Sequence, residues 1–428
     1  MEMKKYKLGE LMDVTRGQSL SGEYYSKSGN LVRLTLGNFD YHNNCFKDDK
    51  SKDNLYFTGS VKKEFILKKD DIITPLTEQA IGLLGSTAKI PCSGKYIQSQ
   101  DVALIKCNKK LNPDFAFYLI PSKIVRNQLS AAAQQTKIRH TSPDKIKDCS
   151  VWVPEYSEQE KIGKLLSRID NKIAINRQIN RNLEELAKQI YDYWFVQFDF
   201  PNEEGKPYKS SGGKMVWNDV LKREIPDGWE VKKIEDFCRI FTGKKDVNQS
   251  LDFGKYKFFS CAPGYRFSNE KLYEGKAILI SGNGSYTGRT IFVNDAFDLY
   301  QRTYAVVLKT DNTDCLEYIF YTAKRFLSLK VGGGTHGSAI PYIVYDDIAK
   351  ECFPFCEIAI EKFQKLIVQI LSRISRIEKE ILELSNLRDN LLPLLMNGQV
   401  TLNSCLSLII HLYNTIFARF NFTTRNSK

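Results

Sequence analysis

Residues 162–194 read IGKLLSRIDNKIAINRQINRNLEELAKQIYDYW, and residues 363–395 read FQKLIVQILSRISRIEKEILELSNLRDNLLPLL. In the first stretch mostly apolar residues recur at alternating steps of four and three, the heptad pattern of a helix that packs along another helix. When 201 is added to each of these residue numbers, the same pattern of mostly apolar residues appears in the second stretch. We call each set of positions a stripe. The stripes are Ile162, Leu166, Ile169, Ile173, Asn176, Asn180, Leu183, Ala187, Ile190 and Trp194, and Phe363, Ile367, Ile370, Ile374, Ile377, Ile381, Leu384, Arg388, Leu391 and Leu395.

Two long stripes in matched register predict two helices that pack on each other. Because a long segment connects them, we expect the pair to be antiparallel. The alternative is two unrelated amphipathic helices. Asn176 and Asn180 interrupt the first stripe with amides. Such amides either fix the register of the pair at some cost in stability, or face solvent beside a local bend.

The regions before each helix also correspond, which predicts a duplicated domain. When the two halves are aligned at an offset of 203 residues, Gln98 aligns with Gln301, Lys106 with Lys309, and residues 117–118 with residues 320–321. Short strand-like runs at 102–107 and 305–308 are followed by helical stretches at 113–129 and 316–329, with Gly and Pro between them. We therefore expect two α+β domains. Residues 201–228, rich in Lys, Gly, Ser and Pro, are typical of a linker between the halves.

The composition is that of a folded protein with a basic balance. Lys and Arg number 62 against 50 Asp and Glu, a net charge of +12, which favours a polyanionic partner, although many basic proteins have none. The ten cysteines form no C-x-x-C pair and indicate buried thiols in a reducing cytosol. The N-terminus does not have the pattern of a signal peptide, and no run approaches the ~20 apolar residues that span a bilayer. A cytoplasmic protein without membrane contact is expected.

Motifs of catalysis and metal binding are missing from the sequence. Gly243-Lys244 lacks the other residues of a phosphate-binding loop, and Gly282–Gly288 precedes a strand-like run instead of a helix. The four histidines are scattered, so no metal site is predicted. The Asn/Asp-Pro-Pro-Tyr/Phe signature of adenine methyltransferases is absent. We therefore expect no catalytic residue.

Two copies of one domain on a basic chain suggest two DNA-reading heads. Arg, Lys, Asn and Gln read base edges, and Arg, Lys, Ser, Thr and Tyr contact phosphates. A polar loop precedes each long helix; the alternative is an ordinary solvated loop. Its candidates are Gln134, Gln135, Lys137, Arg139 and His140 in the first half, and Thr335, His336 and Ser338 in the second.

Weaker candidates for DNA contact follow a glycine-containing turn, precede a strand or flank the turn predicted at Asn283-Gly284, and each could instead serve packing or the surface. They are Arg16, Gln18 and Gln98 in the first half, and Lys244, Lys245, Tyr286, Arg289, Gln301, Arg302 and Tyr304 in the second.

From about Tyr6 to Val400 the chain resembles the specificity (S) subunits of type I restriction-modification enzymes. The most specific stretch is residues 175–201, INRQINRNLEELAKQIYDYWFVQFDFP, which is similar to the central conserved region of that family. GKMVW at 213–217 and IPDGWE at 225–230 resemble its entry to the second recognition domain, and LRDNLLPLLMNGQV at 387–400 resembles its C-terminal conserved region. Residues 401–428 continue past that pattern, and we assign them no role.

The resemblance implies two target-recognition domains, at 1–156 and 229–356, held apart by spacer helices at 157–200 and 357–400 that form an antiparallel coiled coil. It implies double-stranded DNA as ligand, with two modification (methyltransferase) subunits and further restriction (translocase/endonuclease) subunits as partners. S-adenosylmethionine, ATP and magnesium would be bound by those partners and not by this chain. The alternatives are a stand-alone double-stranded DNA-binding protein and the specificity part of another methylation-based defence system. The missing methyltransferase and nuclease motifs argue against a third alternative, a fused restriction-methylation enzyme.

The spacer length fits a site in two parts. A helix over residues 162–195 is about 51 Å long, and readers on one face of DNA lie about one turn, ~34–36 Å, apart. The loops of the two domains differ in sequence, so the expected site is an asymmetric pair of half-sites around an unread gap.

Overall fold

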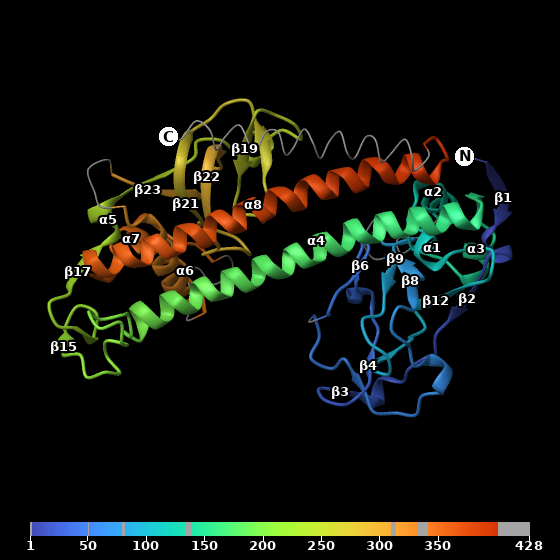
Figure 1. Ribbon diagram of the computed structural model, residues 1–428, viewed down its shortest axis with the longest axis horizontal. Helices are drawn as coiled ribbons and strands as arrows, with labels where there is room; N and C mark the ends of the chain where they lie inside the picture. The colour runs from blue at the N-terminus through green and yellow to red at the C-terminus, as the bar shows by residue number, and fades with distance from the viewer. Residues whose placement is uncertain are drawn as a thin grey trace. The chain divides into compact units, whose positions relative to one another are not determined.

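The computed structural model describes residues 2–49, 51–78, 82–132, 139–309, 314–332 and 341–400. The chain divides into two compact units. Unit 1 comprises Met1–Asn176 and Glu380–Lys428, and unit 2 comprises Arg177–Lys379. Two long helices, α4 (Tyr156–Tyr191) and α8 (Glu357–Met396), contribute to both units (Figure 1). No helix in the described ranges is long and apolar enough to cross a membrane.

Helix α4 consists largely of good helix formers and contains no proline. It ends in a π-turn at Asp192–Val196, where the backbone N–H of Gln197 donates to the carbonyl of Asp192 at 2.9 Å. Phe198 follows with a φ of 63°, which a right-handed helix cannot accommodate. The chain therefore leaves the helix at this point.

In unit 1, the first half of α4 packs on the last part of α8. Leu166 and Ile173 share a core cluster with Leu391 and Leu395. Asp170 of α4 pairs with Arg388 at 2.9 Å, and Lys172 pairs with Glu380 at 3.2 Å. Since the partners in α8 descend in number as α4 ascends, the two segments are antiparallel.

Unit 2 repeats this arrangement with the other halves of the helices. Asn180 Nδ2 donates to the carbonyl of Ile374 at 3.4 Å, and the rings of Trp194 and Phe363 lie 6.0 Å apart. Asn176 is 1% and Asn180 7% exposed, so both amides lie in the buried seam and not in solvent. The expected antiparallel coiled coil is confirmed. Of the predicted seam, the half-buried members are Leu183, Ile190, Ile370, Ile381, Leu384 and Arg388, and the others are buried.

The rest of unit 1 is α+β. Among its described residues, antiparallel strands form a four-stranded sheet in the order β10-β8-β12-β2. The predicted helix at 113–129 is two helices, because Pro121 cannot continue the first. The helices are α1 (Pro113–Leu119), α2 (Lys123–Ala132) and α3 (Pro143–Lys147), and the strands are β1 (Met3–Lys7), β2 (Met12–Arg16), β3 (Tyr25–Ser26), β4 (Val32–Arg33), β5 (Phe39–Asp40), β6 (Cys45–Phe46), β7 (Tyr56–Phe57), β8 (Ile72–Pro75), β9 (Thr77–Glu78), β10 (Ala88–Lys89), β11 (Tyr96–Ile97), β12 (Val102–Cys107), β13 (Arg139–His140) and β14 (Ser150–Pro154).

Unit 2 is also α+β. Its described strands include a six-stranded sheet in the order β18-β23-β21-β22-β19-β20. Ile278 and Ile280 of β21 pack in the hydrophobic core that α6 and the coiled coil share. The alternate residues Ala277 and Leu279 lie on the other face of the sheet, in a second hydrophobic cluster. The helices are α5 (Ile234–Phe237), α6 (Leu316–Gly332) and α7 (Tyr345–Ala349), and the strands are β15 (Met215–Asn218), β16 (Arg223–Pro226), β17 (Glu230–Lys233), β18 (Cys238–Thr242), β19 (Tyr256–Phe259), β20 (Arg266–Ser268), β21 (Tyr273–Ser281), β22 (Thr290–Leu299), β23 (Thr303–Leu308) and β24 (Cys352–Phe355).

The strand pairing of unit 1 recurs in unit 2 and corrects part of the sequence alignment. Strand β12 pairs with β2, Cys107 opposite Met12, as β23 pairs with β18, Leu308 opposite Cys238. Cys107 therefore corresponds to Leu308 at an offset of 201. The offset reaches 203 only at the helices, because α6 starts two residues later after its strand than α1 does. Gln301 thus corresponds to Gln100 and not to Gln98, and Lys106 does not correspond to Lys309.

The segment expected to be a linker, residues 201–228, is ordered. Strands β15 and β16 pair antiparallel, with Met215 opposite Pro226. The rings of Phe200 and Tyr208 stack at 4.8 Å, and Ser210 donates to the buried carboxylate of Asp199 at 2.6 Å. This segment is therefore a folded part of unit 2.

Candidate nucleic-acid interface

A glycine allows two chain segments to cross closely in each unit. A Cβ on Gly17, directly after β2, would lie 2.2 Å from the carbonyl oxygen of Gln98. A Cβ on Gly243, directly after β18, would lie 1.7 Å from the carbonyl oxygen of Leu299. Neither position can accept a larger residue without moving the backbone. The turns after β2 and β18 therefore lie directly against the segments that lead into β12 and β23.

Two further segments join these turns at the same end of each sheet, and equivalent backbone hydrogen bonds hold them there in the two units. In unit 1 Leu76 donates to Asp101 at 2.8 Å, and Thr141 donates to Leu76 at 2.8 Å. In unit 2 Gly282 donates to Arg302 at 3.0 Å, and Ile343 donates to Gly282 at 2.8 Å. We call each set of four segments a loop edge. They are residues 16–18, 76–78, 98–101 and 139–141 in unit 1, and 243–246, 282–289, 300–302 and 341–343 in unit 2.

Six of the candidates that the sequence singled out, Gln134, Gln135, Lys137, Thr335, His336 and Ser338, lie outside the described residues. The other candidates all lie in or directly beside the loop edges. In the sequence they occupy separate turns and strand ends, and the strand pairing brings them together.

The unit 1 loop edge presents exposed polar side chains. Arg16 is exposed at the end of β2, and within the described ranges its side chain has no ion pair or hydrogen bond. Gln18 is half-buried, and its amide donates to the carbonyl of Ser60 at 3.3 Å and accepts from the backbone N–H of Lys62 at 3.4 Å. Arg16 is therefore available to a ligand, and Gln18 is so only in part.

Gln98 and Gln100 have opposite environments. Gln98 is 1% exposed, and its amide donates to the carbonyls of Thr15 at 2.7 Å and Val102 at 3.1 Å. This corrects the proposal that Gln98 contacts DNA, because its side chain is used within the domain. Gln100, which sequence analysis missed, is exposed, and among the described residues its amide has no partner. Its correspondence with Gln301 would have been visible with the strand offset of 201.

Arg139 and His140 form strand β13 beside β9. Arg139 pairs with the buried carboxylate of Glu78 at 3.5 Å and keeps 41% of its side chain exposed. The Nδ1 atom of His140 lies 3.2 Å from the hydroxyl of Thr77. Both side chains are oriented by β9 while remaining within reach of a ligand.

The unit 2 loop edge carries two exposed cations. Lys244 and Arg302 are exposed, and no carboxylate in the described part of the chain pairs with either. Gln301, also exposed, donates from its amide to Asp246 at 3.2 Å, which orients it. Unpaired cations beside an oriented amide are groups that suit phosphate and base-edge contacts.

Tyr286 and Arg289 lie in the connection between β21 and β22. Tyr286 is 48% exposed, and Arg289 donates to the carbonyl of Ala262 at 3.3 Å. Gly284 has a φ of 82°, which supports the turn predicted at Asn283-Gly284. This connection therefore displays Tyr286 at the unit 2 loop edge.

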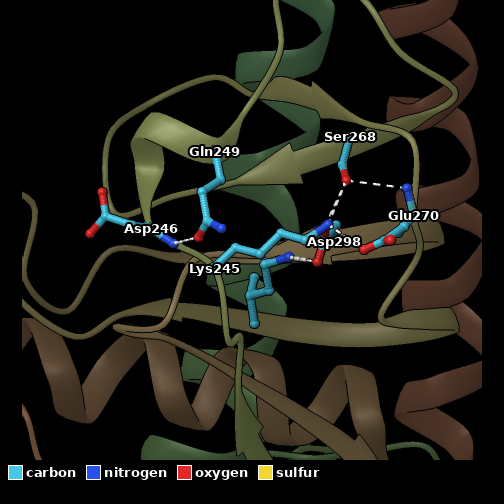
Figure 2. A network of polar contacts seen from close by, with 7 residues as sticks. Lys245, Asp246, Gln249, Ser268, Glu270 and Asp298 are labelled. Carbon is cyan, nitrogen blue, oxygen red and sulfur yellow. Dashed lines mark hydrogen bonds and ion pairs between the residues drawn. The ribbon is translucent and has the colours of Figure 1, made fainter.

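Two candidates in unit 2 are held by the protein itself. Lys245 pairs with Asp298 at 2.7 Å and with Glu270 at 2.8 Å (Figure 2). Tyr304 donates its hydroxyl to the carbonyl of Ile343 at 3.2 Å, and burial raises its pKa. These contacts hold the loop edge together, so Lys245 and Tyr304 are engaged within the protein, unlike the exposed Lys244 and Arg302.

The described residues contain no group of three or more His, Cys, Asp or Glu side chains that could hold a metal ion. The exposed polar groups of the loop edges include the amides of Gln100 and Gln301, the guanidinium groups of Arg16 and Arg302 and the ammonium group of Lys244, which are donors for hydrogen bonds and partners for anions. The arrangement is suited to binding a polyanion through two separate surfaces.

Comparison with known proteins identifies the family. The family model of the "Type I restriction modification DNA specificity domain" matches residues 1–185 and 226–385. The chain is 25% identical over 307 residues to the type I restriction enzyme MjaIX specificity subunit of Methanocaldococcus jannaschii, covering 67% of this chain and 69% of that protein. It is 23% identical over 477 residues to the HindI specificity subunit of Haemophilus influenzae, covering 93% of this chain and 100% of that protein. The type I S subunit structure from M. genitalium shares the fold, with a TM-score of 0.59 at 16% identity, over 92% of this chain and 96% of that one. The chain therefore belongs to the family of type I restriction-modification specificity subunits.

Proposed function

We propose that this chain recognises an asymmetric, bipartite and gapped site in double-stranded DNA, and that each loop edge reads one half-site. The chain directs adenine methylation or restriction by partner subunits and is not itself catalytic. Two equivalent loop edges with different side chains support this proposal most strongly. Beside the equivalent amides of Gln100 and Gln301, unit 1 presents Arg16 where unit 2 presents Lys244 and Arg302. Edges of the same architecture but different donors select different bases.

The charge of the chain supports DNA as the ligand. The net charge is +12, and Arg16, Lys244 and Arg302 are exposed cations without a carboxylate partner among the described residues. Cations of this kind gain free energy from a phosphate backbone by releasing its condensed counterions. A cation already paired on the protein surface gains less.

A second surface supports assembly with modification subunits. On α4 and the π-turn that follows it, within unit 2, Ile179 is 36%, Leu186 45% and Tyr193 39% exposed. They recur at steps of seven, so they form a solvent-facing apolar stripe apart from the buried seam. A partner helix would cover such a stripe. In this proposal the modification and restriction subunits bind S-adenosylmethionine, ATP and magnesium.

The test is a base-resolved map of adenine methylation in cells that express the modification subunits with this chain, without it, or with variants. We expect one bipartite gapped motif to be methylated with the chain and bare without it. Lys244→Ala combined with Arg302→Ala should lower methylation of that motif. Lys271→Ala is the matched control, because Lys271 precedes β21 at the end opposite Gly282.

A methylation map that does not depend on this gene would contradict the proposal. Purified chain that methylates DNA with S-adenosylmethionine alone would contradict its non-catalytic part. A stand-alone DNA-binding protein would bind one specific site in vitro but leave the methylation map unchanged.

A further inference from the structure

A buried carboxylate lies directly behind the unit 2 loop edge. Asp298, at the end of β22, is 4% exposed. Its Oδ2 accepts from Lys245 Nζ at 2.7 Å and from the Ser268 hydroxyl at 2.7 Å, and its Oδ1 accepts from the backbone N–H of Leu299 at 2.8 Å. Figure 2 shows these groups converging from three segments of unit 2. We call Lys245, Ser268 and Asp298 the clamp.

The clamp depends on the charge of Lys245. A buried carboxylate is costly unless a cation and hydrogen bonds compensate for its lost hydration. Lys245 supplies the cation, and it also donates to Ser268 at 3.1 Å and to the exposed Glu270 at 2.8 Å. The side-chain hydrogen bonds to Asp298 and Glu270 raise the pKa of Lys245, so the ammonium group stays charged.

The backbone connects the clamp to the exposed donors of the loop edge. The carbonyl of Lys245 accepts from the backbone N–H of Gln301 at 2.9 Å. The next residue, Asp246, accepts from the Gln301 amide at 3.2 Å and is held in turn by Gln249, whose side chain accepts from its N–H at 2.8 Å. Lys244 precedes the clamp, and Arg302 follows Gln301. A displacement of Lys245 would therefore move Gln301 and the adjoining Arg302.

We propose that Lys245 is a positioning residue, whose ion pair with Asp298 holds Gln301 and Arg302 in the geometry that reads the unit 2 half-site. Lys245 makes no phosphate contact of its own. This inference rests on the proposed function. Unit 1 lacks the clamp: Ile97 stands where unit 2 has Asp298, and the buried amide of Gln98 joins the crossing segments instead. Loss of the clamp should therefore affect one half-site only.

The test uses the full chain in complex with its modification subunits, on DNA carrying the mapped motif. Affinity is measured for that DNA and for DNAs with one altered base pair in either half-site, over a range of salt concentrations. Lys245→Met should reduce discrimination at the unit 2 half-site by about tenfold or more, since a well-placed base contact contributes ~1–3 kcal/mol. Discrimination at the unit 1 half-site and the slope of log affinity against log salt should not change. Lys245→Arg should restore most of the discrimination.

Lys244→Ala is the matched control for a phosphate contact. It should lower the salt slope by about 0.9, the value expected for one lost phosphate contact, and keep the ratio between correct and altered sites. If Lys245→Met behaves like Lys244→Ala, Lys245 contacts phosphate and the inference is overturned. It is also overturned if Lys245→Met leaves the unit 2 half-site discrimination intact.

A thermal melt shows whether Lys245→Met still folds. Asp298→Asn gives a second, independent variant, because it keeps an acceptor for the backbone N–H of Leu299 but removes the ion pair. Asp298→Asn should reproduce the effect of Lys245→Met, and unchanged discrimination would overturn the inference. If the wild-type complex does not discriminate between DNA sequences, the proposed function itself fails. If the wild-type complex discriminates and both Lys245→Met and Asp298→Asn retain that discrimination, only the inference about the clamp fails.

Discussion

The guanidinium of Arg388 in α8 donates to the carboxylate of Asp170 in α4 at 2.9 Å, and the hydroxyl of Tyr118 donates to the same carboxylate at 2.6 Å. Arg388 occupies a seam position at which the heptad pattern would place an apolar residue. Its side chain is 12% exposed and that of Asp170 is 26% exposed. The pair joins both long helices and α1 within unit 1.

Arg388→Met should destabilise unit 1, because it leaves Asp170 without its cation. Removing one partner of a buried ion pair costs about 3–5 kcal/mol, and the partial exposure of Asp170 lowers this expectation to about 2 kcal/mol. Urea unfolding followed by circular dichroism measures the change. Lys172→Met is the control, since its pair with Glu380 is about half exposed and contributes at most ~1 kcal/mol. Equal effects of the two variants would contradict the role of Arg388.

Asn176→Leu should raise the thermal stability of the helix pair. The Nδ2 group of Asn176 is buried without a hydrogen-bond partner in the described part of the chain, which costs about 1–3 kcal/mol. A leucine removes that cost and continues the seam. Differential scanning calorimetry gives the change in melting temperature, with the exposed Gln178→Leu as control. A lower melting temperature for Asn176→Leu would mean that the amide has a stabilising partner.

Gln98→Ala and Gln100→Ala should separate folding from recognition in unit 1. Gln98→Ala removes two internal hydrogen bonds and should cost about 1–3 kcal/mol of stability. Gln100→Ala should leave stability unchanged and weaken discrimination at the unit 1 half-site by about 1–3 kcal/mol. Unfolding and DNA-binding measurements on both variants check this. If Gln100→Ala discriminates as well as the wild type does, Gln100 does not contact bases of the unit 1 half-site.

Stability should fall in alkaline solution through Cys149. Burial raises the pKa of this thiol from 9.0 to about 11. Between these values the unfolded chain has released the proton while the folded chain retains it, so the free energy of unfolding decreases as pH rises. Cys149→Ala should show a shallower decrease across this pH range than the wild type. Cys92→Ala, at an exposed site, should not differ from wild type, and equal slopes in all three proteins would contradict the prediction.

The sequence by itself determined the helix pair, the duplicated α+β plan and the family. Heptad spacing depends only on residues three and four positions apart, so it can be read locally. The duplication appears as a constant offset between two stretches of one chain. The same local view selected Arg16 and Lys244 at glycine-containing turns and Gln301 and Arg302 before a strand, and the structure has all four exposed.

Only the tertiary structure decided which polar residues remain available to a ligand. Lys245 is a cation at a turn, as a DNA contact would be, but its ammonium group donates to Asp298, 53 positions away. Gln98 and Gln100 are two residues apart, yet Gln98 bonds to Thr15, 83 positions away, and Gln100 stays exposed. Arg388 in the seam is explained by Asp170, 218 positions earlier. A polar side chain is free or committed according to partners that folding brings together, and local sequence does not contain those distances.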